Sequence, residues 1–305
     1  MDELKIVDEA SPGIRALAPG IFASLGMLIR GGQDRNILEA EQEFIERRLQ
    51  SGNDNFRYRG RMLEYDAYAD ANEKEIERIA TNTLNTLRKT DVATDWSKVN
   101  LSKFNPEFGR RWASEASNVS DETLQTLWAQ LLKGELESPG SVSNDTMSVA
   151  RDMTKERAEE FQILCSAALY DLQGEVMTVV SCGALGQNAL QPFGLSFGVL
   201  MNLAHHRLIV GDVRIYHGTP VALAKAGVHV QHQGSTWFIQ FVDNVDPTAE
   251  MLNVDGVMFT LAGKELARVV EQMCIPEYTE TMSEYLLGEG WIFVPVDRHV
   301  SEETN

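Results

Sequence analysis

The sequence changes its hydrophobic period within one stretch of its C-terminal half. Residues 193–209 read FGLSFGVLMNLAHHRLI, an apolar run that is typical of a short helix ending in a hydrophobic pair. The runs VRIYH (213–217), VHVQHQ (228–233) and STWFIQFV (235–242) follow, separated by Gly and Pro residues. Their period of two predicts strands. This switch from helix to strand places the chain in the α+β class.

Helical spacing returns after these strands. The run LAGKELARVVEQM (261–273) and the segment 277–287 are typical of helices, and WIFVPV (291–296) is typical of a closing strand. The order of helix, strands and helix predicts a winged-helix-like domain over residues 165–305. The whole chain is then α+β and mostly helical, with a helical N-terminal half followed by this C-terminal domain.

Residues 1–90 predict an amphipathic helical hairpin that follows an apolar N-terminal segment. Apolar side chains recur at helical intervals over 36–49 and again over 60–87. Between them, FRYRGRM (56–62) mixes arginines with aromatic residues, a composition that can bind nucleic acid by charge and stacking. Acidic residues follow directly, so a salt-bridged start of the second helix is the favoured interpretation.

The apolar N-terminal segment is IRALAPGIFASLGMLI (14–29), in which Arg15 is the only charge. A helix of this length spans about 24 Å, short of the roughly 30 Å hydrocarbon core of a bilayer, and Pro19-Gly20 would kink or break it. We therefore expect a buried segment or one that faces another copy in an oligomer; the alternative is an interfacial or pore-forming membrane element. The residues expected to make these contacts are Ile14, Leu17, Ile21, Phe22, Leu25, Leu28 and Ile29.

Residues 91–164 are predicted to form a second helical domain. Ser120-Asp121-Glu122 is a good helix start, because a polar cap and acidic residues suit the positive N-terminal end of a helix dipole. Pro139-Gly140 ends this helix, and Ser143 or Asn144 can cap the next one. The stripe that the helix is expected to bury consists of Leu124, Leu127, Trp128, Leu131 and Leu132.

Charge and cysteine content restrict the class of function. The formal net charge is -18 over 305 residues, and residues 165–305 hold 6 basic against 16 acidic residues, so nucleic-acid binding is not expected. Three cysteines without a C-x-x-C spacing argue against a disulfide framework or a structural zinc site. The acidic start of the chain does not resemble a secretion signal. We expect a cytoplasmic protein, which the segment 14–29 would bring to a membrane only in an active state.

Known catalytic motifs are missing from the sequence. It contains no P-loop, no G-x-G-x-x-G before a helix, no H-E-x-x-H and no G-x-S-x-G. We expect a non-enzymatic protein with no catalytic residue, cofactor or metal site; the alternative is an enzyme with unrecognised polar residues. Adjacent or strand-spaced histidines chelate a metal poorly, and cysteines in apolar surroundings are inert. The residues so interpreted are His205, His206, His229, His232, Cys165 and Cys182.

The helix predicted between Ser120 and Pro139 carries a dense signature. Residues 119–143 resemble the core of a bacterial family of unknown function, with the pattern VSDE-x-x-Q-x-LWA-x-LL-x-GE-x-x-x-PG, and the resemblance extends over roughly 60–290. The same core is similar to the bacterial abortive-infection alpha proteins, which implies a role in defence against phage. Packing explains most signature positions: apolar residues fill a helix face, glycines permit turns and proline ends the helix. These structural positions are Trp128, Leu131, Leu132, Gly134, Pro139 and Gly140.

The apolar helix within 193–209 is a candidate surface for a partner. As a DNA-recognition helix it would carry one permanent positive charge, Arg207, where several are needed. Aromatic and apolar anchors suit a protein interface better. The preferred function is therefore self-assembly and recognition of a protein, possibly phage-derived, in abortive-infection defence; the alternative is a transcriptional or DNA-associated regulator. The partner-surface candidates are Phe193, Phe197, Met201 and Arg207.

Replacing Leu25 or Ile29 by Asp tests the role given to the segment 14–29. A charge in an oligomer-facing apolar segment would have to be desolvated, so assembly or defence activity should be lost while the rest of the chain stays folded. Sedimentation velocity and circular dichroism measure the two properties. Unchanged assembly and activity would remove this segment from the mechanism.

Overall fold

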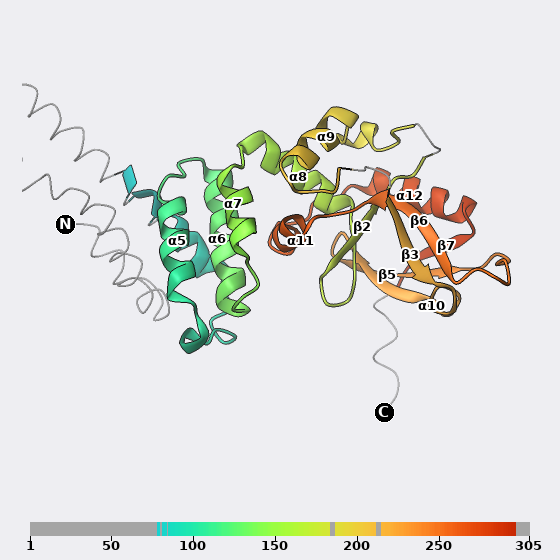
Figure 1. Cartoon of the computed structure of the whole chain (residues 1–305), viewed down its shortest axis with the longest axis horizontal. Coiled ribbons are helices and arrows are strands. Elements are labelled where there is room, and N and C mark those ends of the chain that lie inside the picture. The colour runs from blue at the N-terminus through green and yellow to red at the C-terminus, as the bar shows by residue number, and fades with distance from the viewer. Residues whose placement is uncertain (1–77, 80, 84, 184–186, 212–214, 297–305) are drawn as a thin grey trace, which may run out of the picture. The chain divides into compact units, whose positions relative to one another are not determined.

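The computed structural model describes residues 78–79, 81–83, 85–183, 187–211 and 215–296 (Figure 1). The chain divides into two compact units, Met1–Gly140 and Ser141–Asn305. The segment 14–29, the helix predicted over 36–49 and most of the helix predicted over 60–87 lie outside the described residues. The domain boundaries predicted after residues 90 and 164 stay predictions.

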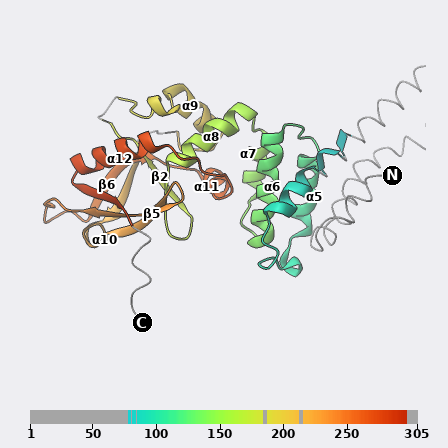
Figure 2. The same cartoon turned by 180° about the vertical axis from the view of Figure 1, so that it is seen from behind.

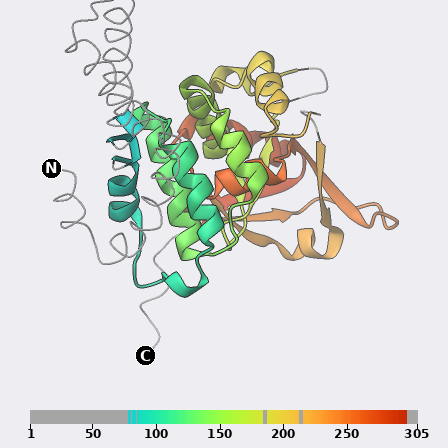
Figure 3. The same cartoon turned by 60° about the vertical axis from the view of Figure 1, so that its left-hand side comes forward.

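The described part of the first unit is helical. Residues 85–93 are in a helix, and a short 3-10 helix, η2 (Leu101–Lys103), precedes α5 (Pro106–Ala116) and α6 (Glu122–Glu137). The predicted start of α6 is confirmed, because the side chain of Asp121 caps the helix by accepting a hydrogen bond from the Leu124 N–H. Figure 3 shows α5 and α6 side by side.

Two tryptophans form the centre of this unit. Trp112 on α5 is fully buried, and its indole N–H donates to the carbonyl of Trp128 on α6 at 2.8 Å. Thr90, also buried, donates its hydroxyl to the Ala129 carbonyl of the same helix. Leu127, Trp128, Leu131 and Leu132 are buried, which confirms most of the predicted stripe, and Leu124 is half-buried.

The end of α6 corrects one prediction. Gly134 was expected to permit a turn, but it lies inside α6, and its carbonyl accepts the N–H of Ser138 at the helix end. The turn comes at Gly140, whose φ of 87° lies in the left-handed region that glycine adopts without steric cost. The buried carboxylate of Glu135 accepts the Gly140 N–H at 2.8 Å and holds this turn against the helix.

The second unit combines helices with one sheet. Its helices are α7 (Asn144–Arg151), α8 (Lys155–Ala167), η3 (Gln191–Phe193), α9 (Phe197–His205), α10 (Val221–Ala226), α11 (Leu261–Ala267) and α12 (Pro276–Gly288). Its strands are β1 (Leu169–Tyr170), β2 (Val176–Val180), β3 (Ile215–Pro220), β4 (Val228–His232), β5 (Ser235–Phe241), β6 (Met251–Val257) and β7 (Trp291–Pro295).

The sheet has the order β3-β6-β2-β1-β4-β5-β7, and every pair of neighbours in it is antiparallel. α10 contacts β3 and β6 at one end of this order and β5 near the other, so the sheet must curl strongly around it. α12 packs on β7 and α8 packs on β2; α12 and α10 lie on opposite sides of the strands (Figures 1 and 2). The core contains the fully buried Leu164, Val179, Leu203, Leu266, Tyr278 and Met282.

The sequence predicted part of this unit. The strands expected near 213–217, 228–233, 235–242 and 291–296 are confirmed as β3, β4, β5 and β7. The helix expected over 261–273 ends at Ala267 as α11, because the following backbone is held against α8, where Ser166 accepts the Met273 N–H. The unit is mixed helix and sheet as expected, but its seven-stranded sheet does not by itself show a winged helix.

Three strands were not predicted. β2 reads VMTVV and is buried on both faces, so it lacks the alternation that reveals a half-exposed strand. β6 reads MLNVDGV, with Asn, Asp and Gly residues that are rare in strands; its six paired positions with β3 override that propensity. β1 has only two residues.

The substitution Gly263→Ala tests the packing of α11. A Cβ at this position would collide with the carbonyl of Leu208, and backbone cannot move aside as a flexible side chain can. Such overpacking should lower the stability by about 3 kcal/mol, measured as a lower melting temperature by calorimetry. Gly288→Ala is the matched control, because apart from its chain neighbours and the backbone of its own helix no atom lies within 4 Å of its Cβ position. An equal effect of the two substitutions would contradict this packing.

Candidate functional site

α9 presents an uncharged apolar face outside the core. Phe197 and Met201 lie one helical turn apart and are 61% and 41% exposed, whereas Leu200 and Leu203 of the same helix are buried. The helix begins at its cap, Ser196, whose hydroxyl oxygen accepts the Val199 N–H. Large apolar side chains exposed together on one helix turn are typical of a protein-binding surface. We call Phe197 and Met201 the α9 face.

Two other predicted surface residues have partners inside the same unit. Phe193 is half-buried, and its ring contacts the ring of Tyr278 on α12 edge-on, with centroids 5.3 Å apart. Arg207 follows α9 and forms an ion pair with Asp145 of α7, with nitrogen and oxygen 2.6 Å apart. The structure therefore places Phe197 and Met201 together on the exposed face. Phe193 before α9 and Arg207 after it contact other helices of the same unit.

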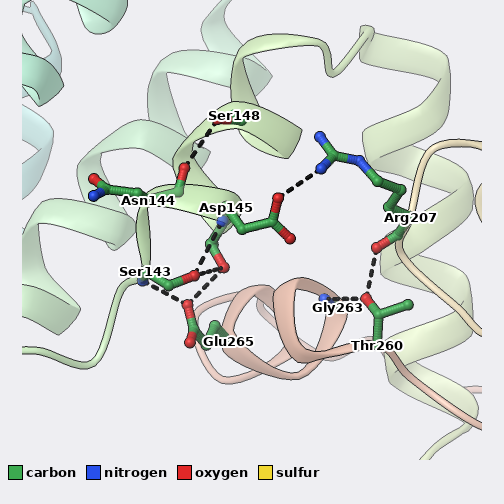
Figure 4. Close-up of polar contacts among 9 residues, drawn as sticks. Ser143, Asn144, Asp145, Ser148, Arg207, Thr260, Gly263 and Glu265 are labelled. Carbon is green, nitrogen blue, oxygen red and sulfur yellow. Dashed lines mark hydrogen bonds and ion pairs between the residues drawn. The ribbon is translucent and has the colours of Figure 1, made fainter.

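A polar cluster around Arg207 fixes the end of α9 (Figure 4). Arg207 has a φ of 60°, an unusual left-handed conformation for a residue other than glycine. Its carbonyl accepts the hydroxyl of Thr260 at 2.5 Å, and the same hydroxyl oxygen accepts the Gly263 N–H and so caps α11. The chain after α9 is thus bonded to α7 through the guanidinium and to α11 through the carbonyl.

Glu265 of α11 completes this cluster. Its carboxylate is almost fully buried, and one oxygen accepts both the Ser143 N–H at 2.7 Å and the Thr146 hydroxyl at 2.6 Å. Ser143 is confirmed as the cap of α7, since its hydroxyl oxygen accepts the Thr146 N–H. A carboxylate at the N-terminus of a helix is stabilised by the helix dipole and by the free N–H groups there. These bonds satisfy the buried charge, so the cluster has a structural role.

Sequence reasoning found only part of this cluster. Ser143 and Arg207 were singled out, but Asp145, Thr260 and Glu265 were not. Thr260 precedes the apolar start of α11, which is a recognisable capping signal. Glu265 has no local signal, because it bonds to residues more than a hundred positions earlier in the chain.

The histidines and cysteines do not converge on a reactive centre in the described part of the chain. His232 is buried between the Ala168 carbonyl, which accepts its Nδ1–H, and the Thr279 hydroxyl, and burial lowers its pKa. Burial also raises the pKa of the Cys182 thiol to about 12 and raises that of Cys165, so both thiols stay protonated. Among the described residues, no three His, Cys, Asp or Glu side chains could hold a metal ion together.

Comparison with protein families gives a match that covers most of the chain. The family described as "Protein of unknown function (DUF2806)" matches residues 57–283. The chain belongs to this family. The matched residues include every helix and strand from α5 to α11. They therefore contain α6, the α9 face and the polar cluster.

Comparisons with curated proteins and with solved structures found no match. Within the described ranges, none of the helices has the length and hydropathy needed to cross a bilayer.

Removing the Glu265 carboxylate tests the role of the cluster. In Glu265→Ala, the Ser143 N–H and the Thr146 hydroxyl lose a charged acceptor, which should cost about 2 to 3 kcal/mol of stability. Thermal unfolding followed by circular dichroism measures this loss. Glu284→Ala, which removes an exposed glutamate from α12, should leave the melting temperature nearly unchanged. The role of the cluster would be refuted by similar melting temperatures for the two variants.

Proposed function

We propose that this protein is not an enzyme and acts by self-assembly and by recognition of another protein, in bacterial defence against phage. The α9 face is the surface that meets the partner. The N-terminal segment 14–29 is the element for assembly or membrane contact, as predicted from the sequence. The partner is a protein that presents an apolar segment, since α9 carries no Asp, Glu, Lys or Arg from Phe197 to His205.

The observation that carries this proposal is the exposure of Phe197 and Met201 on a helix whose ends are fixed. Phe193 packs on α12 before the helix, and Arg207 bonds to α7 and α11 after it. A surface held in place loses little conformational entropy when it binds, which favours affinity. Aromatic side chains at such positions are frequent hot spots of binding energy.

The link to phage defence rests on a different observation. The α6 signature is similar to that of the abortive-infection alpha proteins, and its apolar residues Leu127, Trp128, Leu131 and Leu132 are buried packing positions. The similarity therefore concerns a shared helical core. We infer a shared biological role from it, with the α9 face as the part that recognises the trigger.

The alternative function is a DNA-associated regulator with a winged-helix-like second unit. Its recognition helix would be α9, and Arg207, the one Lys or Arg of the segment 193–209, is held in an ion pair with Asp145. Breaking that pair to reach a phosphate would leave Asp145 near the DNA backbone. Protein recognition is therefore the better proposal, and a salt-dependent shift of duplex DNA by the purified chain would favour the alternative.

Phage plating tests the proposed function. Cells that express the chain from its own promoter should be protected at low multiplicity of infection and should collapse as a culture at high multiplicity. Phe197→Ser should reduce protection by at least about tenfold, because loss of one aromatic anchor weakens an interface by more than 1 kcal/mol.

Leu172→Ser is the matched control, since Leu172 is also a large, exposed apolar residue (53%) of the second unit but lies away from α9, in the turn after β1. This variant should protect like the natural chain. Lack of protection by the natural chain across a broad phage panel would contradict the defence role. Equal protection by the two variants would contradict the role of the α9 face.

A further inference from the structure

One carboxylate lies beside the α9 face. Glu160 of α8 is half-buried, and its Oε2 accepts a hydrogen bond from the side-chain amide of Asn202 on α9 at 3.3 Å. α8 and α9 are in contact, as Figure 1 also shows. Because an amide is neutral, this bond leaves the negative charge of Glu160 uncompensated, and Glu160 forms no ion pair with any residue that the structure describes.

The cations of α8 and of the segment after α9 already have acceptors within the second unit. This unit holds 9 Lys and Arg residues against 21 Asp and Glu residues, so its net charge attracts cationic partners. The pairs that use its cations here are Lys155 with Glu159, Arg157 with the Asp152 carbonyl, and Arg207 with Asp145.

The surface of α9 places an open space between the apolar face and this carboxylate. An α-helix turns by about 100° per residue, so the exposed Gly198 lies between the α9 face and Asn202 around the helix axis. Apart from its chain neighbours and its own helix backbone, a Cβ on Gly198 would meet only the Ser196 hydroxyl, at 3.8 Å. A side chain of a partner can therefore pass over Gly198 from the α9 face to Glu160.

We propose that the α9 face binds a basic amphipathic helix of another protein. The apolar side of this helix contacts Phe197 and Met201, and a Lys or Arg at the edge of that side pairs with Glu160 across Gly198. Two helices pack with side chains of one between those of the other, and the gap at Gly198 suits such packing. The inference rests on the proposed function, to which it adds the charge and the secondary structure of the partner.

Fluorescence anisotropy with a labelled peptide of leucine and lysine tests the proposal on the full chain. A peptide of about 14 residues, patterned as an amphipathic helix, forms about four turns. It should bind saturably at physiological ionic strength and more weakly as salt is added, because salt screens the attraction between charges. The counterpart peptide of leucine and glutamate should not bind. Phe197→Ser should weaken binding at least about tenfold, and Leu172→Ser should leave it unchanged.

Glu160→Gln isolates the contribution of the charge. Glutamine keeps an oxygen that can accept the Asn202 amide N–H, so the variant should fold normally. Its affinity for the lysine peptide should fall about threefold, the usual effect of losing one partly exposed ion pair, and should depend less on salt. Glu284→Gln is the matched control, because it removes an exposed glutamate of α12 from the same unit. Its affinity should equal that of the natural chain.

Four results would overturn the proposal: no saturable binding of the lysine peptide, equal binding of the two peptides, equal affinities of the Glu160 and Glu284 variants, or tighter binding of a peptide with the sequence of residues 10–33. That sequence is mostly apolar, with Arg15 and Arg30 as its only charges, so its tighter binding would identify a second copy of this chain as the occupant. If Phe197→Ser still reduced protection in the plating test, the α9 face would remain a protein surface, and only the basic helix would be rejected.

Discussion

The buried carboxylate of Glu265 is the interaction on which the arrangement of the second unit depends. A buried charge is costly unless it is fully hydrogen-bonded, and this one is satisfied by the N-terminus of α7 and the Thr146 hydroxyl. The carboxylate therefore joins α11 to the N-terminus of α7. Thr260 and Arg207 extend the same constraint from α11 to the end of α9. Glu265 thus joins α11 to α7, and Thr260 joins α11 to the end of α9.

These bonds fix the position of α9 and therefore of its exposed residues. An apolar face on a loose segment would collapse onto the nearest core or aggregate, whereas a face on a helix fixed at both ends stays available for binding. The ion pair with Asp145 also decides the role of Arg207, the one Lys or Arg of the segment 193–209. From the sequence alone, Arg207 could contact a phosphate or a partner. In the structure its guanidinium is paired with the Asp145 carboxylate of the same unit.

Local sequence patterns predicted the helices and strands that have one buried face and one exposed face or a recognisable cap. The stripe around Trp128 on α6, the caps of α6 and α7 and the alternating strands β4 and β5 follow from period and capping chemistry, and all of them are present. β2 and β6 could not be predicted in this way, because one is buried on both faces and the other is kept in the sheet by its pairing with β3. The turn expected at Gly134 failed for a related reason: a glycine allows a turn, but the continuous buried face of α6 favours the helix.

The candidate sites divide in the same way. Phe197 and Met201 were predictable because helical spacing brings them together, whereas the partners of Phe193 and Arg207 come from distant helices. A site therefore cannot be predicted from local sequence patterns where it depends on contacts between residues distant in the chain.

Site-specific photocrosslinking in infected cells tests the central claim most directly. A benzoylphenylalanine introduced in place of Phe197 should form a crosslink to one defined protein after phage infection, and the same probe in place of Leu172 should not. Crosslinks that are absent at position 197, or that are the same at both positions, would contradict the account of α9 as a surface for protein recognition.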